Sequence, residues 1–247
     1  MTKVKNIIIA AFATVALSSC DMFKIDNYDG PNASLHGGIK DAVTGELVET
    51  DIQNGSTLRL YEFGWSNAGS PLTRVVKQNG EYRDDMMFAA HYKVEFINCN
   101  FYPFTVDDIE VKTGDNLRDF QVTPYIRVKN AKITREGSQI VATFNLQPGK
   151  EDVKLSNICL YAHTDIYVGD QVTTYSPGGS GFRQDFSPAI EIDESVTYRL
   201  TIDLTNSVNS EYFKYSKNYY FRVGAMASVS GVGTVRRNYA PHTVIKF

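Results

Sequence analysis

The sequence predicts an all-β protein made of two β-sandwich domains in tandem. Several stretches alternate apolar and polar residues, as in Thr57–Glu62 and Gln139–Leu146, and a period of two is that of a half-buried strand. Turn-forming pairs such as Asn79-Gly80 separate these stretches, and no stretch carries a convincing helical period. The chain has 247 residues, which beyond its N-terminal segment accommodates two domains of about 100–120 residues each.

The N-terminal segment has the layout of a secretory signal. Lys3 and Lys5 precede an apolar run from Ile7 to Leu17, and small residues then lead to Cys20. A charged head, a short apolar stretch and a small-residue cleavage site are typical of export, and the run is shorter than the roughly 20 apolar residues of a membrane-spanning helix. Leu17–Cys20 resembles a bacterial lipobox, which implies cleavage before Cys20 and lipidation of that residue. The alternative is a plain cleavage site beside an incidental cysteine.

This resemblance divides the segment into a lipoprotein signal peptide over residues 1–19 and a tether over residues 20–32. Each lipid methylene buried in a membrane contributes about 0.8 kcal/mol, so more than one acyl chain anchors a protein stably without spanning the bilayer. Asp21, Asp26 and Asp29 partly resemble the acidic export signal of Bacteroidetes lipoproteins. That resemblance implies an outer-membrane protein facing the extracellular side.

The charge balance argues against a nucleic-acid partner. The formal net charge of the whole chain is −3. Removal of Lys3 and Lys5 with the leader makes it −3 − 2 = −5. Nucleic-acid binding depends on phosphate neutralisation by Lys and Arg, and the chain has no basic block. Besides Cys20, the cysteines are Cys99 and Cys159. We expect them to be free buried thiols, with an interdomain bridge as the alternative, and their spacing matches no zinc site.

The first domain is predicted over residues 33–125. Its alternating stretches predict short strands, which begin with a run from Leu35 and continue at 57–62, 92–96, 109–111 and 120–122. Gly114-Asp115 is expected to separate the last two strands, and Asn79-Gly80 is a turn signal.

Three pieces of this segment carry a family resemblance. They are Gly37–Asp41 with Thr44–Glu46, then Leu58–Glu62, then Asn79–Tyr82. Together they resemble the carboxypeptidase-regulatory-like, or transthyretin-like, β-sandwich. The resemblance implies that the Asn-Gly pair turns into a core strand holding Tyr82, and that the domain is accessory, without chemistry of its own.

The second domain is predicted over residues 126–247. Its expected strands lie at 126–128, 131–134, 139–146, 155–161, 190–192, 198–204 and 219–225, followed by a last strand that ends at Phe247. Tyr219 opens a strongly alternating strand and resembles the tyrosine corner of immunoglobulin-like and fibronectin type III-like sandwiches. Those folds place a tryptophan on an earlier core strand, where this chain has Ile158 and Leu160.

The whole arrangement resembles a family of Bacteroidetes lipoproteins with a domain of unknown function, typically encoded in polysaccharide utilisation loci. The resemblance implies a surface-exposed outer-membrane lipoprotein that binds extracellular glycan or supports a glycan-import complex. Its partners would be the membrane, through lipid on Cys20, a polysaccharide and an importer pair. The alternative is a structural or adhesive surface lipoprotein of the fimbrial type, without glycan binding.

We expect no enzyme, no cofactor and no metal site. The four histidines are dispersed, without metal-ligand spacing: His36, His91, His163 and His242. Gly178–Phe182 approaches a nucleophile elbow but lacks its last glycine. The neighbouring carboxylates Asp84-Asp85 and Asp107-Asp108 point to opposite faces of a strand, and we expect them at solvated strand ends. Weak calcium binding by Asp107, Asp108 and Glu110 is the metal alternative.

Aromatic residues in loops are the candidates for glycan binding, since binding loops carried by a rigid scaffold commonly present such rings. Four residues meet this criterion: Trp65, Tyr167, Tyr175 and Phe182. The alternative is that these rings cap the sandwiches or form the joint between the domains. Three other tyrosines are assigned to core or strand packing: Tyr82, Tyr198 and Tyr219.

Overall fold

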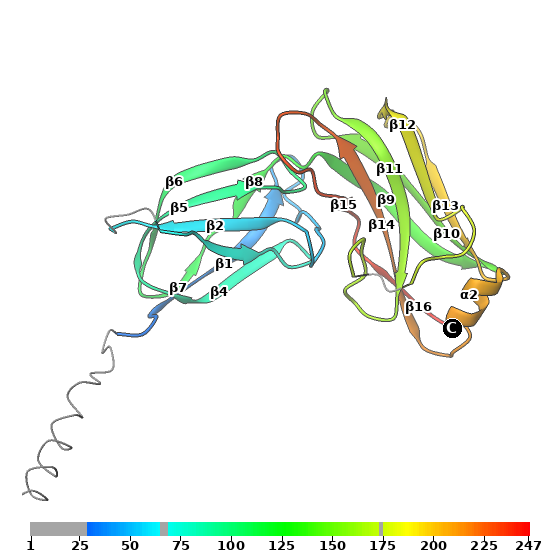
Figure 1. Cartoon of the computed structure of the whole chain (residues 1–247), viewed down its shortest axis with the longest axis horizontal. Coiled ribbons are helices and arrows are strands. Elements are labelled where there is room, and N and C mark those ends of the chain that lie inside the picture. Colours follow the sequence, from blue (N-terminus) through cyan, green and yellow to red (C-terminus); the bar gives the residue numbers. More distant parts are fainter. Residues whose placement is uncertain (1–28, 65–68, 173–174) are drawn as a thin grey trace, which may run out of the picture.

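A computed structural model describes residues 29–64, 69–172 and 175–247 (Figure 1). The predicted signal peptide and residues 20–28 of the tether lie outside the described residues, as does Trp65. The all-β prediction is confirmed, and the strands build two bodies that lie end to end along the long axis of the molecule. No helix in the described ranges is long and apolar enough to cross a membrane.

The first body consists of two sheets. One has the order β4-β1-β7, with β8 also paired to β1, and the other has the order β3-β2-β5-β6. The strands are β1 (Ala33–Asp41), β2 (Thr57–Glu62), β3 (Leu72–Val75), β4 (Glu81–Met87), β5 (Ala90–Ile97), β6 (Phe104–Val111), β7 (Gly114–Leu117) and β8 (Phe120–Val122). Aromatic side chains fill the space between the sheets, and Phe96 alone contacts the rings of Phe101, Phe104 and Phe120.

The predicted turn at Asn79-Gly80 joins β3 to β4. Gly80 has a φ of +86°, and an added Cβ there would lie 2.7 Å from the backbone oxygen of Val48, so only glycine fits. Tyr82 follows in β4 and is 2% exposed, as the resemblance implied. Gly114-Asp115 does lie between the predicted strands, now β6 and β8. Both residues, however, belong to a further strand that was not predicted, β7, which pairs in parallel with β1.

The second body also consists of two sheets, with orders β13-β10-β9 and β12-β11-β14-β15, and β16 also pairs with β14. Its strands are β9 (Ile126–Glu136), β10 (Gln139–Pro148), β11 (Lys154–His163), β12 (Arg183–Glu191), β13 (Tyr198–Asp203), β14 (Asn218–Ser228), β15 (Asn238–Tyr239) and β16 (Thr243–Lys246). A short helix that the sequence did not predict, α2 (Ser207–Tyr212), begins after Asn206, whose side chain accepts from the Val208 N–H.

The tyrosine corner expected at Tyr219 is present. The ring is completely buried, and its hydroxyl donates to the backbone oxygens of Tyr212, at 2.8 Å, and Tyr215, at 3.3 Å. The bond ties the turn after α2 to the start of β14. Tyr198 is also buried, so the assignment of both tyrosines to packing is confirmed.

Both cysteines of the described chain are free and buried, as predicted. Burial raises the pKa of the Cys99 thiol to about 11 and raises that of Cys159 as well. Because the thiolate is the reactive form, both groups are chemically inert in the folded protein.

A polar, buried joint holds the two bodies together. Asn100 of the first body accepts through its backbone oxygen from the Asn238 side chain at 2.8 Å, and its own amide donates to the Arg237 oxygen at 3.2 Å. Asp51 accepts from the Tyr239 hydroxyl at 2.8 Å and from the Asp170 N–H at 2.9 Å. Because these bonds cross between bodies and are shielded from water, they fix one relative orientation.

Candidate functional site

Tyr175 lies in the core of the second body, which corrects its prediction as a binding platform. Its side chain is 5% exposed, its ring stacks on Tyr212 at a centroid distance of 3.7 Å, and its hydroxyl donates to the Asn209 side chain. The segment that carries it folds against α2, where the Gly178 N–H also donates to Asn209, at 2.7 Å. The Gly and Ser residues that follow Tyr175 predict a loop. They carry no information about its contacts with Asn209 and Tyr212, which are distant in sequence.

Phe182 is only half-buried, but its ring packs on the hydrophobic clusters of the second body. It lines a small cleft of about 220 Å³ together with Tyr161, Tyr175 and Arg183. Two of the four predicted residues, Tyr175 and Phe182, therefore line the same cleft, but both rings pack against the core of the second body.

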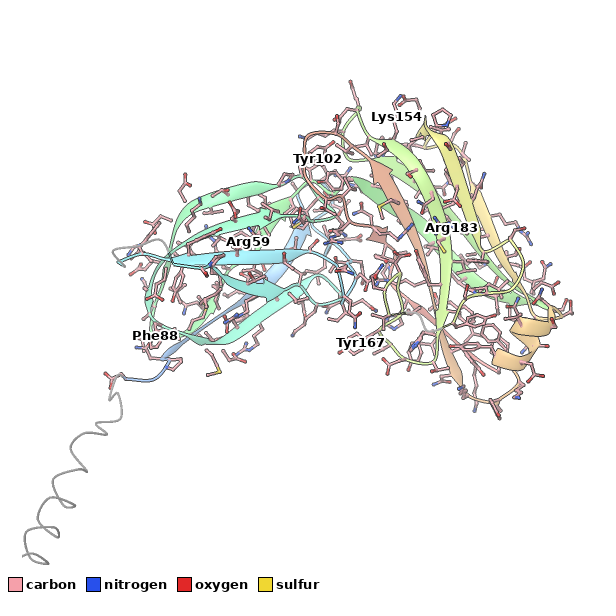
Figure 2. All side chains as sticks on the ribbon, in the orientation of Figure 1. Arg59, Phe88, Tyr102, Lys154, Tyr167 and Arg183 are labelled. Carbon is pink, nitrogen blue, oxygen red and sulfur yellow. The ribbon has the colours of Figure 1, made fainter. Side chains whose placement is uncertain are left out.

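Tyr167 is the predicted candidate that the structure leaves exposed, at 48%. Its neighbours on both sides are held at the joint: the Ile166 oxygen accepts from the Gln78 side chain at 2.8 Å, and the Val168 oxygen accepts from Arg222 at 3.3 Å. Figure 2 shows Tyr167 beside the junction of the two bodies. It is a single ring that belongs to none of the clefts described here.

An apolar cleft lies at the end of the first body, where the chain enters β1. We call it the end cleft; it has a volume of about 780 Å³. Its outer walls are four exposed apolar side chains, which are 37–69% exposed: Phe63, Leu72, Met86 and Phe88. Gly64 and Gly69 also line it, so the loop that contains Trp65 connects two of its wall residues. Trp65 itself lies outside the described residues.

Strand pairing and two hydrogen bonds place the rings of the end cleft. The Phe63 N–H donates to the His91 oxygen at 2.9 Å, which holds the residue just after β2 beside β5. The buried Tyr92 hydroxyl donates to the Phe88 oxygen at 2.9 Å and fixes the β4–β5 turn. Burial raises the pKa of Tyr92 to about 12, so this hydroxyl stays protonated as a donor. Figure 2 shows Phe88 at this end of the molecule.

Few of the described residues that line the end cleft are polar. Tyr61 and Lys93 are register partners on β2 and β5, and the Lys93 ammonium lies 5.5 Å from the Tyr61 ring centroid. Glu62 and Ser70 complete the polar lining. A mostly apolar pocket of a few hundred Å³ with a small number of placed polar groups is the usual form of a small-molecule site.

The sequence contains signals for this cleft besides the predicted residue Trp65. Phe63 stands two positions before Trp65, and the apolar run Met86–Phe88 follows the alternating part of β4. Neighbouring residues of a strand point to opposite faces, so a run of apolar residues puts at least one of them on the exposed face. The sequence does not show that Phe63 and Phe88 line the same cleft, because that depends on the pairing of β2 with β5.

A second cleft, of about 640 Å³, lies at the joint. Its polar lining includes Asp41, Glu46, Arg127 and Lys129, and its single aromatic lining residue, Tyr239, is 6% exposed. The bidentate contact between Arg127 and Asp41 occupies both side chains. This cleft can accept hydrogen-bonding groups, but it offers no ring for stacking.

Two histidines of the described ranges contact acidic side chains in separate pairs. No group of three or more His, Cys, Asp or Glu side chains that could hold a metal ion is found within the described ranges. His91 contacts Asp108 at 2.7 Å, and His36 contacts Asp115 at 2.8 Å. One expectation needs correction: Asp84 is not solvated but 7% exposed, and its carboxylate accepts from Arg74.

Family models match both bodies. The DUF3823 N-terminal domain, described as a protein of unknown function, matches residues 33–123, and the C-terminal DUF3823 domain of unknown function matches residues 126–241. No curated protein matches the chain.

Solved structures share the whole described fold. A "putative carbohydrate binding protein" from Bacteroides uniformis is 50% identical, with a TM-score of 0.83, and the match covers 88% of this chain and 100% of that one. A DUF3823 family protein from Parabacteroides merdae is 24% identical, with a TM-score of 0.68 and coverage of 88% and 100%. One from Bacteroides ovatus is 20% identical, with a TM-score of 0.68 and coverage of 87% and 98%.

Proposed function

The chain belongs to the DUF3823 family, and from that premise we propose that it binds carbohydrate in the end cleft. The observation that carries the proposal is the cluster of exposed apolar side chains around the rings of Phe63 and Phe88. Exposed apolar clusters of this kind usually mark interaction sites. The name of the Bacteroides uniformis relative, at 50% identity, supports carbohydrate as the ligand class.

The chemistry of the end cleft suits a sugar. A pyranose ring presents an apolar face of C–H groups, which stacks on aromatic side chains, and an edge of hydroxyls, which needs donors and acceptors. Phe63, Phe88 and Tyr61 supply aromatic surface, while Lys93 and Glu62 supply a donor and an acceptor. The proposal is binding without bond cleavage, and it requires no cofactor.

We extend the proposal to the placement of the protein. The lipobox-like Leu17–Cys20 and the acidic tether support a lipid anchor on the extracellular side of the outer membrane, beside a glycan importer. The chain from Cys20 to Asn32 spans at most about 47 Å when extended, at roughly 3.3–3.6 Å per residue. A tether of that length would let a polysaccharide reach the end cleft above the membrane.

The binding test uses the mature full-length protein in affinity electrophoresis against a panel of neutral and acidic polysaccharides. We expect retardation by at least one of them, weakened about tenfold by Phe88→Ala or Trp65→Ala, which corresponds to about 1.4 kcal/mol. Tyr167→Ala is the matched control, an exposed ring outside the cleft. Loss of binding in Tyr167→Ala, with Phe88→Ala unaffected, would move the site to the joint and reject the end cleft.

A separate experiment tests the anchor. Mass spectrometry of the mature protein should find lipid on Cys20, and protease added to intact cells should remove the two bodies. An unmodified Cys20, or bodies protected until the outer membrane is opened, contradicts the proposed placement and leaves the binding proposal standing.

A further inference from the structure

A second exposed aromatic residue stands at the opposite end of the molecule from the end cleft. Tyr215, in the turn between α2 and β14, is 59% exposed, more than any other aromatic side chain in the described ranges. Figure 1 shows this turn beside α2, at the far end from the start of β1. Lys214 and Lys217 belong to this turn and lie beside the Tyr215 ring. Arg135 lies over the ring of Phe247, whose backbone is hydrogen-bonded to the turn. We call these three cations and Tyr215 the distal patch.

Hydrogen bonds to Tyr219 and Phe247 hold the backbone of the turn that carries Tyr215. The Tyr219 hydroxyl donates to the Tyr215 backbone oxygen at 3.3 Å. The Lys217 oxygen accepts from the Phe247 N–H at 3.1 Å, and the Ser216 hydroxyl donates to the Phe247 oxygen at 2.6 Å. A ring presented from a pinned turn loses little conformational freedom when a ligand binds.

Positive charge is arranged around the ring. The ammonium groups of Lys214 and Lys217 lie 5.3 and 5.8 Å from the Tyr215 ring centroid. The Arg135 guanidinium lies 4.5 Å from the Phe247 ring centroid. Lys214 forms an ion pair with Glu211 at 2.7 Å, whereas Lys217 has no ion pair with any described residue. The patch therefore carries more positive than negative charge in a chain whose overall charge is negative.

We propose that the distal patch binds an anionic polysaccharide, one that carries carboxylate or sulfate groups. The sugar face stacks on Tyr215, and the acidic groups pair with Lys217, Lys214 and Arg135. An exposed aromatic ring flanked by cations matches a ligand that is both a ring and an anion. The site stands on different residues from the end cleft, so either can fail without the other.

The test measures binding of the mature full-length protein to polygalacturonate, chondroitin sulfate and neutral dextran. We expect at least one anionic polymer to bind, and to bind less well as salt rises from about 0.05 to about 0.5 M, because salt screens exposed charges. Tyr215→Ala should weaken this binding about tenfold and Lys217→Ala about threefold. Glu211→Gln should strengthen it, because it releases Lys214, and a purely structural role would not produce that gain.

Controls separate the distal patch from other exposed lysines, and polysaccharide from lipid as the source of negative charge. Lys112→Ala, which removes an exposed lysine outside both proposed sites, should leave binding of the anionic polymer unchanged. Absence of binding to both anionic polymers, or binding unaffected by Tyr215→Ala and Lys217→Ala, overturns the proposal. It is also overturned if the patch variants impair binding to vesicles of anionic phospholipid while polysaccharide binding is absent.

Discussion

Arg222 in the second body donates to the carboxylate of Glu49 in the first, across 173 positions of sequence. The guanidinium is completely buried, and it also donates to the backbone oxygens of Thr50 and Ala240, both at 2.9 Å. Burial raises the pKa of Glu49 even though Arg222 opposes this shift. The pair is therefore a buried charge contact, satisfied only when the two bodies are docked.

Replacement of Arg222 should uncouple the joint. Arg222→Ala leaves the Glu49 carboxylate and several carbonyl oxygens without their donor, and breaking a buried ion pair from one side costs about 3–5 kcal/mol. We expect a lower midpoint of urea denaturation and two separate unfolding transitions where the unaltered protein shows one.

A matched variant controls for the loss of an arginine. Arg199→Ala removes an exposed arginine of β13 and should change the free energy of unfolding by no more than about 0.5 kcal/mol. Equal unfolding midpoints for Arg222→Ala and Arg199→Ala would show that the joint does not depend on the buried pair.

Removal of one hydroxyl should test the tyrosine corner. Tyr219→Phe keeps the buried ring but leaves the Tyr212 and Tyr215 oxygens without their donor, and such a loss costs about 1–3 kcal/mol. Thermal or urea unfolding measures this change. Tyr167→Phe removes an exposed hydroxyl and serves as the control, and a Tyr219→Phe protein as stable as this control would contradict the expected role.

Acid should destabilise the joint through Asp41. Burial by itself would raise the pKa of the Asp41 carboxyl, but hydrogen bonds from Arg127 and the Val43 N–H outweigh it, so the pKa lies below the ordinary 3.8. A carboxyl with a lowered folded pKa contributes stability above its unfolded pKa, and that contribution is lost as the pH falls. We therefore expect the contribution to be complete near pH 5 and to fall progressively as the pH drops below about 3.8 towards the lower folded pKa.

Urea denaturation between pH 7 and pH 2.5 measures this dependence. Asp41→Asn should lower stability at pH 7 and flatten the decline in acid, because the ionised partner of Arg127 is gone. Asp107→Asn, at an exposed position of β6, should leave the profile unchanged. A decline in Asp41→Asn as steep as in the unaltered protein would assign the acid sensitivity to other carboxylates.

Strand positions were predictable where one face of a strand is buried. Thr57–Glu62 and Phe120–Val122 form strands with the predicted limits, because a period of two records which face meets the core. Strands at the edge of a sheet, with most side chains exposed, do not show this alternation. β3 and β7 have mostly exposed side chains, and neither was predicted as a strand. The helix α2 has six residues, too few to establish a helical period.

The sequence by itself determined the all-β class, the buried free cysteines and the tyrosine corner at Tyr219, because each depends on local pattern or residue chemistry. Only the tertiary structure decided that Tyr175 is buried, that Arg222 meets Glu49, and that Phe63 and Phe88 line one cleft. These outcomes depend on contacts between segments far apart in the chain. Alternation of apolar and polar residues shows which side of a strand is buried, but it does not identify the residues that pack against that side.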